Sequence, residues 1–200
     1  MADACRLTII GSIGDRAINS IVSRDASGVI THKVTLPAAK AGTLSTRTSD
    51  TAGTLTLGAA HGILEADVID IYWDGGRAYG ATVGVIDVLD VPFTLAAGDV
   101  LPAEDAAITA QKQTVIDTDF DADLLVAVAA GCTQKVCIGV MEVAARSKTL
   151  DVAAAEACWW VDDQWTANPL AGLTVTSMVV TQGGVAEAVF SIGILYDSEA

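Results

Sequence analysis

A hairpin signal, Asp67-Val-Ile-Asp-Ile-Tyr-Trp-Asp-Gly-Gly-Arg-Ala-Tyr-Gly-Ala-Thr-Val83, stands near the middle of this 200-residue sequence. Its two arms are rich in β-branched and aromatic residues, which favour strands. The Asp-Gly-Gly triplet between them supplies a tight turn. Upstream, the strands Thr43–Arg47 and Thr54–Leu57 flank a second turn at Ser49–Gly53. Short strands at such regular spacing predict a compact β-module over residues 43–111.

The sequence on either side of this module also predicts strands. Residues 4–14, 29–36, 135–143, 173–181 and 186–196 alternate or are rich in Val and Ile. Periodicity leaves residues 124–130 open between a strand and a short helix, and residues 150–160 open between helical turns and irregular structure.

We therefore expect an all-β fold, in which a jelly-roll-like β-sandwich carries an inserted small β-barrel-like module. Residues 1–37 and 112–200 would form the discontinuous sandwich, and residues 43–111 the insert. This arrangement requires Val29–Leu36 to pair with strands that follow residue 112.

The composition excludes several classes of protein. Hydrophobic residues make up 52% and charged residues 18%, which is too apolar for a disordered chain. No stretch approaches the roughly 20 apolar residues of a membrane helix, and no signal peptide is recognisable. The net charge of −14 opposes binding to phosphate backbones. We expect neither a membrane nor a nucleic-acid partner.

An acidic ladder, Asp117-Thr-Asp119-Phe-Asp121-Ala-Asp123, is the sharpest chemical feature. Carboxylates at alternate positions are candidate calcium ligands. The helix-loop-helix calcium motif, however, needs glycine where Ala122 stands and glutamate where Val128 stands. The favoured interpretation is a solvated strand edge followed by a turn, since charges along an edge block stray pairing.

Three tryptophans near the C-terminus, Trp159, Trp160 and Trp165, are candidate interface residues. Adjacent residues of a strand point to opposite faces, so one of Trp159 and Trp160 can fill a core while the other faces outward. An outward tryptophan serves as an interface anchor or as a platform for a sugar ring. We favour a subunit contact.

The cysteines and histidines indicate no catalytic or metal centre. Cys132 and Cys137 have no second pair to complete a zinc site, so we expect the thiols to pack as small apolar groups. His32 and His61 lack the spacing of a metal or nucleophile motif, and we expect His61 in a turn. The sequence therefore predicts a protein that is not an enzyme and needs no cofactor.

Motifs spread over most of the chain carry a family resemblance. The runs Leu36–Asp50, Ala60–Ile63, Tyr72–Gly76, Gly98–Pro102 and Asn168–Gly172, with Ile194–Ser198, resemble uncharacterised virion proteins of tailed bacteriophages and prophages. The resemblance implies a particle component with no catalytic residues.

On this basis we expect a capsid decoration or cement protein, located on the virion surface. It would be a homo-oligomer, with a trimer favoured, bound to the major capsid protein or other virion proteins. The alternatives are a tail or fibre component, or a carbohydrate-binding β-module.

Overall fold

The protein is built from β-strands throughout the part of the chain that the structure describes. The computed structural model describes residues 4–13, 16–25, 28–95, 100–121, 125–143, 145–153, 157–161, 168 and 170–196. These residues form sixteen strands and no helix, so the all-β prediction is confirmed. The chain divides into two compact units: unit 1 is Met1–Leu36, Val115–Val180 and Ala188–Ala200, and unit 2 is Pro37–Thr114 and Thr181–Glu187.

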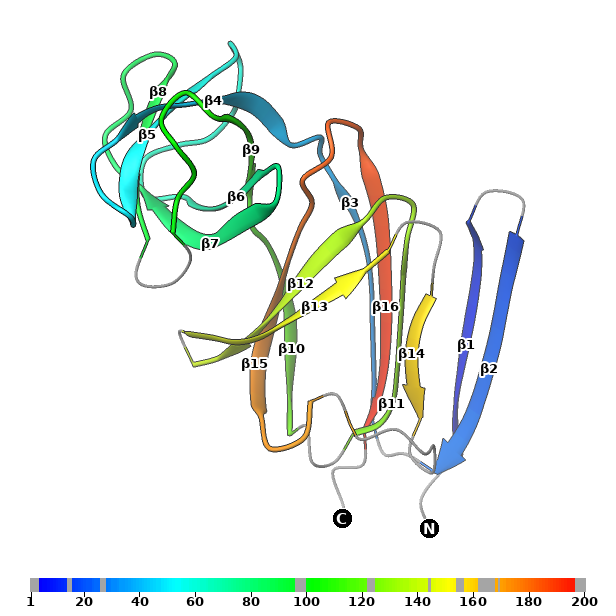
Figure 1. Cartoon of the computed structure of the whole chain (residues 1–200). Helices are drawn as coiled ribbons and strands as arrows, with labels where there is room; N and C mark the ends of the chain where they lie inside the picture. The colour runs from blue at the N-terminus through cyan, green and yellow to red at the C-terminus, as the bar shows by residue number, and fades with distance from the viewer. Residues whose placement is uncertain are drawn as a thin grey trace. The chain divides into compact units, whose positions relative to one another are not determined.

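Unit 1 contains a two-stranded hairpin and two four-stranded sheets (Figure 1). The hairpin pairs β1 (Ala4–Ile13) with β2 (Arg16–Asp25). One sheet has the order β10-β15-β12-β13 and the other β14-β11-β16-β3. The sheet strands are β3 (Gly28–Leu36), β10 (Thr114–Asp121), β11 (Leu125–Cys132), β12 (Val136–Glu142), β13 (Ala145–Val152), β14 (Ala157–Val161), β15 (Thr174–Thr181) and β16 (Ala188–Tyr196).

These eight strands pair from the ends of the set inwards. The first strand, β3, pairs with the last, β16, over its whole length, and this is the pairing that a split sandwich requires. Strand β10 then neighbours β15, β11 pairs with β14, and β12 pairs with β13. A nested antiparallel ribbon that is rolled into two sheets in this way is an eight-stranded jelly roll.

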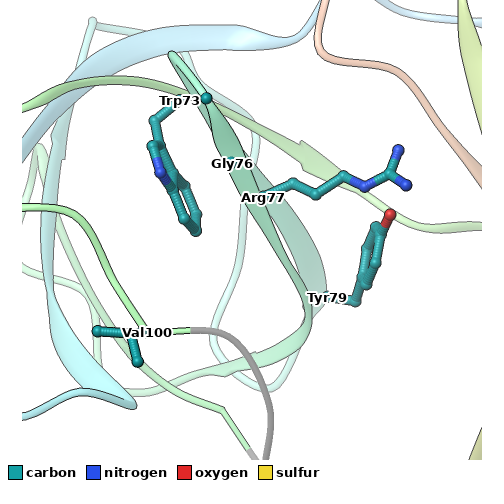
Figure 2. A pocket seen from close by; sticks show the side chains of 6 residues that line it. Trp73, Gly76, Arg77, Tyr79 and Val100 are labelled. Carbon is teal, nitrogen blue, oxygen red and sulfur yellow. The ribbon is translucent and has the colours of Figure 1, made fainter.

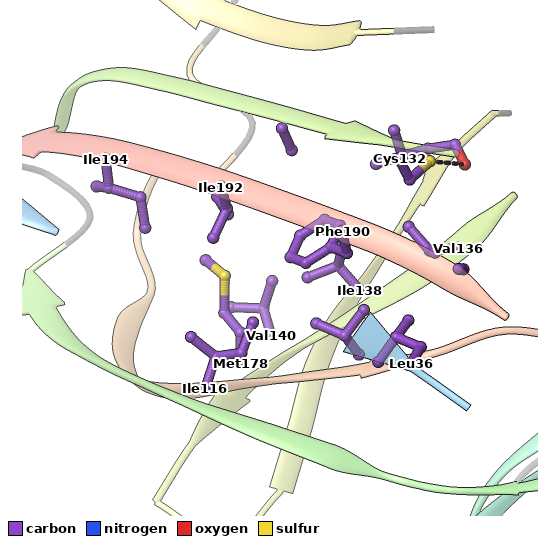
Figure 3. Packing of buried hydrophobic residues seen from close by; sticks show 14 of the residues in the cluster. Leu36, Ile116, Cys132, Val136, Ile138, Val140, Met178, Phe190, Ile192 and Ile194 are labelled. Carbon is purple, nitrogen blue, oxygen red and sulfur yellow. Dashed lines mark hydrogen bonds between the residues drawn. The ribbon is translucent and has the colours of Figure 1, made fainter. Parts of the chain in front are cut away.

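One buried cluster joins the two sheets of unit 1 (Figure 3). Strand β16 contributes Phe190, Ile192 and Ile194 at every second position, as a strand with one face inward must. Ile138 and Met178 come from the opposite sheet. Burying one such large side chain contributes about 1.5–3 kcal/mol, so this shared cluster holds the sheets face to face.

Unit 2 is a closed six-stranded barrel with the order β4-β5-β8-β7-β6-β9 (Figure 1). Pairing of the first strand with the last closes it, which leaves no exposed sheet edge. The inserted barrel-like module that the sequence predicts is thus present. Its strands are β4 (Lys40–Arg47), β5 (Ala52–Leu57), β6 (Val68–Trp73), β7 (Gly76–Val83), β8 (Asp90–Thr94) and β9 (Ala107–Lys112).

The barrel has its own apolar core. Leu55 and Leu57 on β5 and Ile69 and Ile71 on β6 point inward at alternate positions. The sequence Gly-Thr-Leu occurs at residues 42–44 and 53–55, on the two sides of one hairpin, in which β4 and β5 pair with Leu44 opposite Leu55. This second buried cluster gives unit 2 an interior independent of that of unit 1.

The outer face of the barrel carries a buried carboxylate at Asp70, which has no solvent exposure. Its Oδ1 accepts hydrogen bonds from the Gly80 amide (2.9 Å) and from Gln113 Nε2 (2.7 Å). Its Oδ2 accepts from the Thr181 hydroxyl (2.6 Å), which also lies 2.6 Å from the Tyr72 hydroxyl. A buried carboxylate requires several hydrogen-bond donors, because removing its charge from water is costly.

The segment 181–187, which runs from the last residue of β15 to the start of β16, belongs to unit 2 and follows this polar face. The Gln182 amide donates to Gln111 Oε1 (2.5 Å), and the Thr109 hydroxyl donates to the Gly183 carbonyl (2.9 Å). In the barrel ladder Gln111 lies opposite Asp70 and Thr109 lies opposite Tyr72. One four-residue polar patch on β6 and β9 therefore binds the segment.

Several sequence expectations are corrected in detail. Residues 16–25, to which the sequence assigns no strand, form β2, and pairing with β1 along ten residues supplies their backbone hydrogen bonds. Of residues 150–160, residues 150–152 belong to β13 and residues 157–160 to β14, while residues 154–156, the centre of the Ala-rich run, lie outside the described residues. Residues 125–132 form a strand, which decides the alternative left open there.

Strand β8, which begins at Asp90, contains a proline at position 92. Pro92 is tolerated in this strand for a geometric reason. Its carbonyl accepts the Gly84 amide, beyond the point where β7 ends at Val83, and a strand residue directs its N–H and C=O to the same side. The missing N–H therefore faces Gly84, just beyond the end of β7, and costs the β5–β8 ladder no bond.

We predict that Asp70→Ala destabilises unit 2 by about 3 kcal/mol, because it removes the shared acceptor of one buried and two partly buried donors. Thr181→Val, which removes one donor, should cost about 1–2 kcal/mol. Urea denaturation of the full chain measures both. Asp74→Ala, at an exposed turn position, is the control and should stay within about 0.5 kcal/mol of the wild type. Equal stability of Asp70→Ala and the control would contradict this prediction.

Candidate functional site

The β6–β7 hairpin of the barrel borders an open hollow of about 480 Å³. The hollow is lined by Trp73, Gly75, Gly76, Arg77, Tyr79 and Val100. Figure 2 shows the indole of Trp73 and the side chain of Val100 on one side of β7, with the Arg77 and Tyr79 side chains on the other. Trp73 is half-buried and packs partly against the barrel core. The hollow therefore opens beside an aromatic ring held by the barrel.

Glycine at position 76 is required for this placement of the indole. Gly76 lies directly opposite Trp73 in the β6–β7 ladder. A Cβ at residue 76 would come within 2.5 Å of Cε2 and Nε1 of Trp73, closer than real Cβ atoms approach. Gly75, in the turn, has φ of 82°, a conformation that glycine adopts freely. The Asp-Gly-Gly turn thus closes the hairpin and also makes room for the ring.

Arg77 lies over the ring of Tyr79, with 5.1 Å from its guanidinium carbon to the ring centroid. This is a cation–π contact between alternate residues of one strand. Arg77 is the only Lys or Arg between residues 48 and 111. Chemically, the hairpin offers an indole for stacking, two glycines that let a ligand approach the backbone, and a single cation at the rim.

A second surface feature is formed by two loops of the barrel, residues 58–67 and 84–90. Backbone hydrogen bonds connect each loop to the strand that flanks the other. The Ala66 amide donates to the Val83 carbonyl, and the Leu57 amide donates to the Leu89 carbonyl, each at 3.0 Å. The two loops therefore form one surface.

His61 bridges these loops. Its Nδ1 accepts the Ile63 amide hydrogen at 3.1 Å, so the proton must be on Nε2. Nε2 lies 3.3 Å from the Val88 carbonyl oxygen, to which it donates. The neutral Nε2–H tautomer is thus the form that makes both bonds. His61 lies in a loop between strands, as the sequence predicts.

Asp67 anchors the first loop. Its Oδ2 accepts the Leu64 amide at 2.8 Å, and its Oδ1 lies 2.5 Å from Lys112 Nζ. Burial raises the pKa of the Asp67 carboxyl, but the hydrogen bonds from Lys112 and Leu64 and the charge of Lys112 together outweigh burial, so the pKa lies below its usual range. The ionised form of Asp67 therefore stabilises the loop.

The acidic ladder lies on β10, at the edge of its sheet. Asp117 is exposed between the buried residues Ile116 and Thr118, which agrees with a solvated strand edge. Asp119 and Asp121 belong to the same strand, but their side chains, and all of Asp123, lie outside the described residues. Among described residues no group of three His, Cys, Asp or Glu could hold a metal ion. Calcium binding by the ladder stays an untested hypothesis.

The tryptophan candidates are placed only in part. Trp159 and Trp160 lie on β14, an edge strand, opposite Ala129 and Val128 of β11. Their side chains and the whole of Trp165 lie outside the described residues. Their proposed interface role stays a prediction.

The two cysteines whose side chains are described pack as expected. Cys132 and Cys137 are buried thiols without a disulfide bond. Burial raises the pKa of the Cys132 thiol, more than its hydrogen bond with the Val136 backbone lowers it. The side chains of Cys5 and Cys158 lie outside the described residues.

Sequence reasoning missed the aromatic hollow and the paired loops. The hairpin turn at Asp74–Gly76 was a usable signal for the first, because two consecutive glycines beside a tryptophan leave space next to its ring. No local pattern brings residues 58–67 next to residues 84–90.

No protein-family model, curated protein or solved structure matches this chain. Within the described residues, no helix has the length and apolar character needed to cross a membrane. A functional proposal therefore rests on the jelly roll, the inserted barrel and the two barrel surfaces.

We predict that the contribution of Asp67 to stability depends on pH in a defined direction. Because the folded-state pKa of Asp67 is lowered, its contribution is fully present above about pH 5 and is lost as the pH falls below about 4. Wild type should exceed Asp67→Asn in stability at neutral pH, and the difference should shrink in acid. Urea denaturation of both proteins between pH 7 and pH 3 measures this, and a difference that does not change with pH would overturn it.

Proposed function

We propose that this protein is a non-enzymatic structural component of a bacteriophage virion, and specifically a decoration or cement protein of the capsid shell. It would bind the outside of the shell as an oligomer, with the major capsid protein as its main partner. The observation that carries the proposal is the nested strand order of unit 1, since eight-stranded jelly rolls recur in viral capsid domains. The resemblance to virion proteins of tailed phages agrees with it.

Charge supports an outward position. A net charge of −14 would oppose close contact with packaged DNA, whose phosphates are bound by Lys and Arg. The same charge keeps an externally placed protein soluble. A ligand that binds only the assembled shell stabilises that shell by mass action, and this is how a cement protein would act. A tail or fibre component is the alternative within the same class.

Quantitative mass spectrometry of purified particles tests the proposal. The protein should be present in hundreds of copies per particle, in a fixed ratio to the coat protein, and should be released without opening the shell. A few copies per particle would favour a tail or fibre part. Absence from particles would contradict the virion proposal as a whole.

A carbohydrate-binding module is the second candidate, and the Trp73 hollow favours it. Sugar rings stack their apolar faces on indole rings, and jelly rolls also occur in lectins. The open volume, the two glycines and the cation of Arg77 suit a saccharide better than a purely apolar ligand.

We predict that, if this second function holds, Trp73→Ala weakens glycan binding by about tenfold or more, because stacking on the indole is lost. Gly76→Ala, which displaces the indole without removing it, should also weaken binding. Trp165→Ala tests the other tryptophan platform and should have no effect. Glycan arrays followed by calorimetry measure this. The hypothesis fails if wild type binds no glycan, or if binding survives Trp73→Ala.

A further inference from the structure

The paired loops of the barrel expose a group of apolar side chains, which we call the apolar tip. It consists of Val88, Val85, Leu64 and Leu89, which are 81%, 73%, 64% and 37% exposed. Single exposed apolar residues are ordinary on protein surfaces. Four of them on two loops bridged by the hydrogen bond between His61 and Val88 are a different case, because clustered apolar surface marks interaction sites.

Val88 is also in a strained backbone conformation, with φ of 51°. Its turn is closed by hydrogen bonds between the backbones of Asp87 and Asp90, at 3.0 and 2.8 Å. Positions with left-handed φ favour glycine, asparagine or aspartate, whereas a β-branched side chain there crowds the backbone. At 81% exposure, valine has little packing within this chain to offset the strain. Such strain concentrates at binding sites.

The charged residues within the two loops are all acidic. The two loops carry Glu65, Asp67, Asp87 and Asp90 and no Lys or Arg. Asp67 is bound to Lys112, and Asp90 accepts a hydrogen bond from the Thr56 hydroxyl, while Glu65 and Asp87 are exposed. The tip therefore presents apolar contacts inside an acidic rim.

We infer that the apolar tip docks into an apolar recess on a different protein, whose rim carries Lys or Arg. Charge complementarity selects this occupant, because the acidic rim repels another tip, an anionic lipid surface and nucleic acid. The bridge made by His61 and the anchor made by Asp67 hold the loops in place before binding, which lowers the entropy lost on docking. The identity of the partner rests on the proposed function: it is the capsid shell.

Binding of the purified full-length protein to particles that lack it tests this inference. Val88→Asp and Val85→Asp should weaken binding about tenfold or more, since each places a charge in the apolar contact. Aspartate also tolerates the conformation at residue 88, so Val88→Asp should fold. Val185→Asp is the matched control, because Val185 is 68% exposed on the same unit and outside the tip. It should bind within about twofold of wild type.

Val88→Asn separates strain from binding. Asparagine adopts left-handed φ readily, so this variant should raise the Tm of unit 2 by about 2–6 °C while it weakens binding to particles. Binding by the wild type should weaken with added salt, because the contacts at the rim are screened.

Each of the remaining outcomes rejects a particular part of the inference. If wild type binds particles and Val88→Asp binds equally well, the tip is not the docking surface, although the virion function stands. If wild type binds no particle, both proposals fail. Self-association in sedimentation that Val88→Asp abolishes would assign the tip to a second copy, and binding to phosphatidylserine vesicles would assign it to a membrane; either result overturns the inference.

Discussion

The barrel depends on a carboxylate that has lost all contact with solvent. Asp70 is bonded by donors that lie 10, 43 and 111 residues away in the chain. A buried carboxylate without such donors would be strongly destabilising, so the barrel needs all three segments at once. The third donor is the Thr181 hydroxyl, which stands at the end of the seventh of the eight jelly-roll strands in chain order. Residues 37–114 therefore contain all six barrel strands but do not supply every hydrogen-bond donor to Asp70, so this part of unit 2 depends on long-range contacts.

In the barrel, the polar groups that stabilise the fold are distinct from the surfaces that stay exposed. The segment 181–187 occupies the polar patch formed by Asp70, Tyr72, Thr109 and Gln111. The hydrogen bonds of this patch are internal to unit 2. The hollow beside Trp73 and the apolar tip are what the described part of unit 2 leaves open. Because a closed barrel has no sheet edge to offer a partner, recognition has to use its loops and hairpin ends.

Fold and function are connected here by different kinds of argument. The jelly roll of unit 1 supports a virion role only by architecture, and the same architecture occurs in lectins and cupins. The argument from the apolar tip is physical. An exposed valine in a strained conformation destabilises the free protein, and only a partner that covers this valine offsets that cost. Both arguments support a role in binding, although the partner inferred for the tip rests on the virion proposal.

Local chemistry in the sequence determined the strands, many of the turns and the all-β class. Alternation along β5, β6 and β16 and the Asp-Gly-Gly turn are encoded by neighbouring residues, so periodicity could find them. Residues 16–25 were missed because their polar residues break the alternation, and only pairing with β1 makes them a strand.

Tertiary structure alone decided the nested strand order, the membership of residues 181–187 in unit 2, and the two exposed surfaces. Each depends on residues far apart in the chain, such as Asp70 with Thr181 and His61 with Val88. A strand pattern states which face of a strand is apolar but not which strand lies beside it. Glycine 76 shows the same limit, because the sequence marked it as a turn residue and only the packed structure shows that it also makes room for the indole of Trp73.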